Sequence, residues 1–215
     1  MTPTLIFSKG GHRMTTEPLK TKILAVSLPL FIEHGYKKVT YKQIADAVGI
    51  SKSLLQYHYP QKSQLMADLM NVNFNQWLKT IPEGDLYTRL TAFLLMFFDF
   101  ISTNKAVNGL MTEIIANNEL FNAFMTFFSN WLADNNFVKH DDNKVKAALL
   151  FAVSGGLQLY RFKDSLMVPV EQVTHTIIAT LLTIVGKSSQ LIDSTFHNAE
   201  TLYQQLRIKG WQLVY

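Results

Sequence analysis

The sequence contains no cysteine and no uncharged run long enough to cross a membrane. Its 215 residues include no Cys, which excludes a disulfide framework, a thiolate metal site and a cysteine nucleophile. The longest uncharged runs, 147–160 and 172–186, are too short and too polar to span a bilayer. Neither lies at the N-terminus, where a signal peptide would be. We therefore expect a cytoplasmic protein with no membrane partner.

Catalytic and cofactor motifs are also missing. The six histidines do not have the spacing of metal ligands. Ser154-Gly155-Gly156 does not follow a strand pattern, so it is not a nucleophile elbow. The chain also lacks a phosphate loop and a dinucleotide fingerprint. The sequence predicts no catalytic residue, no metal site and no cofactor, and an enzyme is the least favoured interpretation.

Charge is unevenly distributed along the chain. Residues 1–65 hold nine Lys and Arg against three acidic residues, a net charge of +6. The remaining 150 residues hold eleven against thirteen, a net charge of −2. A basic N-terminal third on a slightly acidic body is typical of a protein whose head binds a polyanion. Apolar residues make up 48% of the chain, enough for a large core.

Helical periodicity extends through almost the whole chain, and no strand pattern is convincing. Pro29, inside the first helical pattern, predicts a kink or a frayed last turn. Thr40-x-x-Gln43 is a capping box, Gly49 ends that short helix, and Ser51 caps the next. We expect an all-α fold with helices at about 16–35, 40–47, 51–57, 61–80, 85–103, 105–116, 118–134, 143–162, 170–185 and 190–208.

The first thirteen residues do not resemble the start of a domain. The run from Lys9 to Met14 is compatible with a purine-rich ribosome-binding site placed in frame before a methionine codon. We interpret Met14 as the start of translation and residues 1–13 as an extension. A disordered tail is the alternative.

Residues 21–65 resemble the DNA-binding head of TetR-type (TetR/AcrR) transcriptional regulators. The resemblance rests on the Gly35-Tyr36 turn, Thr40, the run Val48-Gly49-Ile50-Ser51, the aromatic cluster that follows, and Lys62. It implies a three-helix head with a helix-turn-helix over 14–62, and a larger helical domain for ligand binding and dimerisation over 63–215. It further implies a homodimer that binds double-stranded DNA at a palindromic operator and responds to a small-molecule effector.

In a helix-turn-helix the second short helix enters the major groove. Leu54 or Leu55 is expected to face inward with the apolar residues of the first helix. Lys52 has donors suited to guanine and Gln56 has the donor and acceptor suited to adenine, while Lys62 is expected to bind phosphate. The expected DNA contacts are Thr40, Tyr41, Lys42, Ser51, Lys52, Ser53, Gln56, Tyr57, His58 and Lys62.

The larger domain is rich in aromatic residues, which suits a mostly apolar ligand pocket. Its predicted lining is Phe93, Phe97, Asn117, Phe124, Phe128, Gln158 and Tyr160. Asp99 would suit a cationic ligand, but helical spacing separates it from the main apolar stripe, and we interpret it as solvated. The predicted dimer interface is Val153, Gly156, Leu157, Thr174, Ile177, Ile178, Leu181, Leu182 and Val185.

These features predict a homodimeric repressor that a small, mostly apolar ligand releases from its operator. The alternative keeps the DNA-binding head and assigns the helical body to a protein partner.

Overall fold

The computed structural model describes residues 16–139, 142–208 and 213. Within these ranges the chain forms ten helices and no strand, which confirms the all-α prediction. The extension proposed for residues 1–13 lies outside the described residues. The helices are α1 (Thr16–His34), α2 (Tyr41–Val48), α3 (Lys52–His58), α4 (Lys62–Leu78), α5 (Leu86–Thr103), α6 (Lys105–Ala116), α7 (Asn118–Asp134), α8 (Asn143–Leu166), α9 (Val170–Ile184) and α10 (Ser189–Arg207).

Capping residues determine where the helices of the N-terminal part begin and end. The Thr40 side chain accepts from Gln43 N and the Gln43 side chain accepts from Thr40 N, so the capping box before α2 is present. Gly49 ends α2 in the left-handed region at φ +80°, where a side chain would be strained. α1 continues through Pro29 to His34, so the frayed turn expected there is absent.

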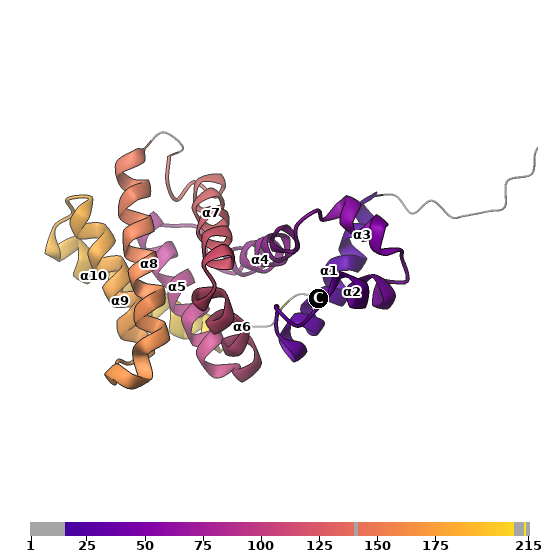
Figure 1. Ribbon diagram of the computed structural model, residues 1–215. Coiled ribbons are helices and arrows are strands. Elements are labelled where there is room, and N and C mark those ends of the chain that lie inside the picture. The colour runs from indigo at the N-terminus through magenta and orange to yellow at the C-terminus, as the bar shows by residue number, and fades with distance from the viewer. Residues whose placement is uncertain (1–15, 140–141, 209–212, 214–215) are drawn as a thin grey trace, which may run out of the picture.

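The helices gather into two groups joined by α4 (Figure 1). The head is α1, α2 and α3, and the body is α5 to α10. Within the body α8 packs against α9, and α5 packs against α9 and α10, while α6 contacts both α7 and the head helix α1. α4 contacts α1 on one side and α7 on the other, so it belongs to both groups.

An aromatic cluster fixes α4 to the body. The Phe74 ring on α4 lies 5.1 Å from Phe93 and 5.6 Å from Phe97 on α5, centroid to centroid, and 5.4 Å from Trp131 on α7. These contacts are edge-on, the arrangement that aromatic pairs prefer. The helix that leaves the head is thus anchored in the centre of the larger domain.

α5 is the central helix of the body. Among the described residues it is the one helix as long and as apolar as a membrane span, but 61% of that stretch is buried inside the fold. The helices α6, α9 and α10 cover α5. Burial of this kind is typical of a core helix. The length and composition of α5 therefore do not indicate a membrane protein.

Candidate DNA-binding surface and effector cavity

The two short helices of the head are held at a fixed angle by a small apolar core. Ile44, Ala45 and Val48 of α2 are buried with Leu55 of α3. Leu54 is 39% exposed, so Leu55 is the inward residue of the predicted pair.

The outward face of α3 carries polar and aromatic side chains. Lys52, Ser53 and Gln56 are exposed, and Tyr57 is 79% exposed with its ring edge-on to His58. Positions 52, 53, 56 and 57 share one face because residues three to four apart lie side by side on a helix. The head therefore presents a short helix whose donors and acceptors point into solvent.

Three other residues predicted to face DNA have partners inside the head. The Thr40 and Ser51 hydroxyls cap α2 and α3 by accepting from Gln43 N and Leu54 N. The Tyr41 hydroxyl donates to the Tyr59 carbonyl at 2.8 Å, which ties the start of α2 to the end of α3. Lys42 remains exposed.

Lys62, predicted to bind phosphate, has partners within the head. Its Nζ donates to the carbonyls of Tyr36 and Val39 at 2.6 and 2.9 Å and lies 4.2 Å from the centre of the Tyr36 ring. Burial lowers the pKa of Lys62, while nearby carboxylates oppose that shift. The ammonium is used to hold the α1–α2 turn.

Glu113 of α6 holds the same turn from the body. Its two carboxylate oxygens accept from Tyr36 N and Lys37 N, each at 2.8 Å. Gly35 begins the turn at φ +84°, and a Cβ there would lie 3.2 Å from Glu113 Oε2. We call this arrangement the turn clamp: Glu113 binds the N–H groups of the turn and Lys62 binds its carbonyls.

An apolar cavity of about 70 Å³ lies where α1, α4, α5 and α6 meet. Leu28 and Ile32 of the head helix α1 form part of its wall. The remaining lining residues are Met66, Leu69, Met70, Asn73, Phe74, Trp77, Phe97, Phe100, Ile101, Val107, Leu110, Met111, Ile114, Phe124 and Leu213. A ligand here would contact the head and the body at the same time.

Two of the seven predicted pocket residues, Phe97 and Phe124, line this cavity. Phe93 and Phe128 are buried in the aromatic cluster instead. Asn117 caps α7 by accepting from Leu120 N, and Gln158 is exposed on α8. The Tyr160 hydroxyl donates to Asn108 Oδ1 at 3.0 Å, and burial raises the pKa of Tyr160 to about 12.

The sequence interpretation missed the contribution of α4 to the cavity. Met66 and Met70 are four residues apart and Asn73 follows on the same side. Methionine is flexible enough to adapt to different apolar ligands, so this spacing was a usable signal. Among the described residues no group of three His, Asp or Glu side chains is placed to hold a metal ion.

Comparisons with known proteins agree with this geometry. The family model described as "Bacterial regulatory proteins, tetR family" matches residues 23–69, which include the whole helix-turn-helix. The HTH-type transcriptional regulator QacR of Staphylococcus aureus is 26% identical over 159 residues, 64% of this chain and 83% of QacR. Over its head the chain is thus similar to the DNA-binding domain of TetR-family regulators.

Other relatives extend the likeness along the chain. The HTH-type transcriptional activator FasR of Mycolicibacterium smegmatis is 25% identical over 111 residues, which is 49% of this chain and about half (51%) of FasR. A TetR transcriptional regulator from Rhodococcus sp. RHA1 shares the fold, with a TM-score of 0.58 over 82% of this chain and 100% of that chain at 14% identity. The chain thus shares the fold of these regulators, with an N-terminal helix-turn-helix domain and a larger helical domain.

The predicted dimer interface lies mostly inside the single chain. Eight of its nine residues are buried within the single chain, where they pack α8 and α9 against each other and α9 against α5. The closest approach is at Gly156, where a Cβ would overlap the side chain of Ile177. Arginine at Gly156 or Leu181 would therefore disrupt the fold itself.

A different face of α8 remains apolar and uncovered. Leu150, Phe151, Phe162 and Leu166 are 41, 69, 51 and 59% exposed. Gly155 lies on the same outward side, and a Cβ there would meet nothing within 4 Å. The sequence prediction placed Val153, Gly156 and Leu157 of α8 at the interface, and it did not identify this outward face.

The turn clamp gives a direct test of the link between head and body. Glu113→Gln keeps one acceptor oxygen but loses the charge, so Tyr36 N or Lys37 N loses its partner. We expect a loss of about 1–2 kcal/mol in unfolding free energy and weaker DNA binding, because α2 follows the loosened turn. Urea unfolding and fluorescence anisotropy with a DNA site selected from a random pool measure both effects.

Glu119→Gln is the matched control. It removes the same charge near Tyr36, on which Glu119 acts electrostatically. Equal stability and DNA affinity in the two variants would show that the hydrogen bonds of Glu113 contribute nothing beyond its charge.

Proposed function

We propose that this regulator is a homodimeric repressor of the cytoplasm that a small, mostly apolar molecule releases from a palindromic operator. The observation that carries this proposal is the apolar cavity, whose wall includes the head helix α1. A ligand can change DNA affinity only if it binds the DNA-competent and released conformations unequally. A cavity shared by head and body is suited to that difference.

The size of the cavity supports coupling between ligand and head. At about 70 Å³, it is much smaller than the roughly 300–1,000 Å³ that drug-sized ligands occupy. A ligand of that size would have to displace α1, α4 or α6. Each of those helices contacts the head or belongs to it, so the displacement would be transmitted to α3.

The exposed face of α3 supports direct reading of a DNA sequence. Lys52 is proposed to contact guanine and Gln56 adenine in the major groove. Tyr57, the most exposed of the group, is suited to a thymine methyl or the sugar-phosphate backbone. Lys42 and the free N–H groups at the start of α4 are proposed to contact phosphate, with Lys62 supporting them from inside the turn.

The uncovered face of α8 supports a dimer with a second copy of this chain. α8 and α9 already form a packed pair, and two such pairs related by a two-fold axis make a four-helix bundle. The outward face combines Phe151 and Phe162 with Gly155, which would allow the partner helix to approach closely.

Sequence reading by α3 is tested with Gln56→Ala. The variant is expected to lose preference at one base pair of each half-site, at a cost of about 1–3 kcal/mol, while non-specific binding is retained. Selection from a random DNA pool, followed by anisotropy titrations, measures both quantities. Lys79→Ala, an exposed lysine at the far end of α4, is the control and should bind as the wild type does. An unchanged selected sequence for Gln56→Ala would remove Gln56 from the recognition surface.

The dimer face is tested with Phe151→Arg. The side chain is exposed in the single chain, so the variant should fold normally but sediment as a monomer and bind the operator weakly. Gly156→Ala should instead destabilise the fold by about 1–3 kcal/mol through overpacking against Ile177. A Phe151→Arg protein that remains dimeric would assign this face of α8 to a different protein partner.

Ligand release is tested with two phenylalanines of α5. Phe97→Leu enlarges the cavity, so n-alkanols should bind more tightly but displace less DNA, because the walls no longer have to move. Phe93→Leu is the matched control: it removes a ring of the same aromatic cluster that does not line the cavity. Coupling of about 1–3 kcal/mol would weaken operator binding by roughly 5- to 150-fold in the wild type.

The measurement is operator anisotropy with alkanols from butanol to dodecanol, together with melting temperature. If none of these alcohols shifts either quantity in the wild type, the cavity is a packing defect and not an effector site.

A further inference from the structure

A second pocket lies on another side of α5, and its lining differs chemically from that of the apolar cavity. This pocket, of about 230 Å³, lies between α5, α9 and α10. Leu95, Phe98 and Asp99 of α5 face it, opposite Tyr203 of α10. Phe97, Phe100 and Ile101 face the apolar cavity instead, so the helix separates the two. We call the second space the acidic pocket.

Two carboxylates and an unpaired hydroxyl line the acidic pocket. Asp99 and Glu171 contribute the carboxylates. Thr174 is completely buried, and its Oγ1 has no hydrogen-bond partner among the described residues. Buried hydroxyl groups are nearly always hydrogen-bonded, so an orphan on a residue that lines a pocket points to a missing partner there.

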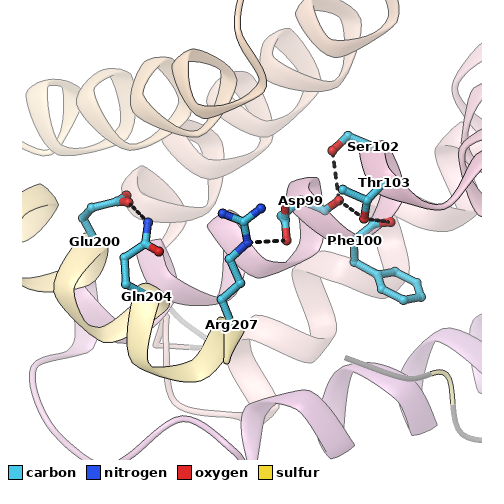
Figure 2. A network of polar contacts seen from close by, with 7 residues as sticks. All are labelled: Asp99, Phe100, Ser102, Thr103, Glu200, Gln204 and Arg207. Atoms are coloured by element: carbon cyan, nitrogen blue, oxygen red, sulfur yellow. Dashed lines mark hydrogen bonds and ion pairs between the residues drawn. The ribbon is translucent and has the colours of Figure 1, made fainter. Parts of the chain in front are cut away.

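The charge within the pocket is only partly neutralised. Arg207 is the nearest cation: its Nε lies 3.8 Å from Asp99 Oδ2 (Figure 2). The Arg207 side chain is 55% exposed, and an exposed ion pair at that distance is weak. Glu200 adds a further negative charge nearby while accepting from Gln204 at 2.7 Å (Figure 2).

The pKa of Tyr203 depends on the charged side chains around the acidic pocket. Burial, and after it the charges of Asp99 and Glu200, raise the pKa of Tyr203 to about 12, while Arg207 opposes this shift. Two carboxylates, Asp99 and Glu200, therefore act on Tyr203 against a single arginine.

We propose that the acidic pocket binds a small organic cation with an ammonium or guanidinium group. Such a group only donates hydrogen bonds, which suits the carboxylates of Asp99 and Glu171 and the free lone pairs of Thr174 Oγ1. The centre of the Tyr203 ring already lies 6.0 Å from the Arg207 guanidinium, so its face is one over which a cation is stabilised. An organic cation fits better than a metal ion, because no group of three His, Asp or Glu side chains is placed to hold a metal in the described part of the chain.

Arg207 has a defined part in this proposal. It is the cation of the chain itself, and the ligand displaces it from Asp99. The acidic pocket does not depend on the proposed apolar effector, because the two spaces lie on different sides of α5 and share none of their lining residues.

Benzylammonium is a suitable probe, and benzyl alcohol is its neutral counterpart. A cavity of about 150 Å³ accommodates benzene, so a single-ring amine fits the acidic pocket. Calorimetric titration of the full-length protein should show binding of benzylammonium but not of benzyl alcohol. Arg207→Gln should tighten binding, because it removes the competing cation.

The pocket variants separate the contacts. Asp99→Asn should weaken benzylammonium binding at least tenfold, since charge-assisted hydrogen bonds are the strong ones. Thr174→Val should raise the melting temperature without ligand and lower the affinity for benzylammonium. Glu171→Gln removes the other carboxylate, at a more exposed position. It should also weaken benzylammonium binding, and it provides the test if the Asp99→Asn protein does not fold.

Several results would overturn the proposal. Absence of binding in both the wild type and Arg207→Gln would do so, as would equal affinity for benzyl alcohol. Wild-type affinity in both Asp99→Asn and Glu171→Gln would remove the carboxylates from the site. If alkanols still release all these variants from DNA, the proposed effector cavity is unaffected by the failure of the acidic-pocket proposal.

Discussion

The orientation of the DNA-binding head depends on how the turn between α1 and α2 is held. The backbone N–H and C=O groups of a turn confined between two domains need partners. Here the donors of the turn bind the Glu113 carboxylate, and its acceptors bind the Lys62 ammonium. Both charges come from outside the turn, on helices that also enclose the apolar cavity. The contacts that complete the turn therefore also connect it to the part of the molecule where a ligand would act.

Local signals in the sequence were sufficient for the helices and for the head. The Thr40–Gln43 capping box, Gly49 and Ser51 act within a few residues of themselves, so sequence spacing predicts them directly. Glu113 lies 76 and 77 residues from its partners, and no periodic pattern connects them. The contacts of Lys62 with the turn were not predicted for the same reason, because its carbonyl partners, Tyr36 and Val39, lie 26 and 23 residues earlier in the chain.

The larger domain was harder to predict because its helices are apolar on more than one side. Hydrophobic spacing shows that a face is buried but not which neighbour covers it. Phe93 and Phe97 are four residues apart, yet one contributes to the aromatic cluster alone while the other also lines the cavity. Likewise, the residues of α8 and α9 expected at a dimer interface pack within the chain, and the free surface is shifted around α8 to Phe151 and Phe162.

The participation of α1 in the cavity wall limits how far this chain can be treated as two exchangeable modules. Leu28 and Ile32 complete a space that the body would otherwise leave open, and Glu113 fits a turn of this head. A chimera that joins this head to the body of another regulator would need a compatible apolar surface and a carboxylate at the position of Glu113. For exchange of the proposed DNA specificity, the outward face of α3 is the smaller unit, since Lys52, Ser53, Gln56 and Tyr57 are exposed and take part in neither contact.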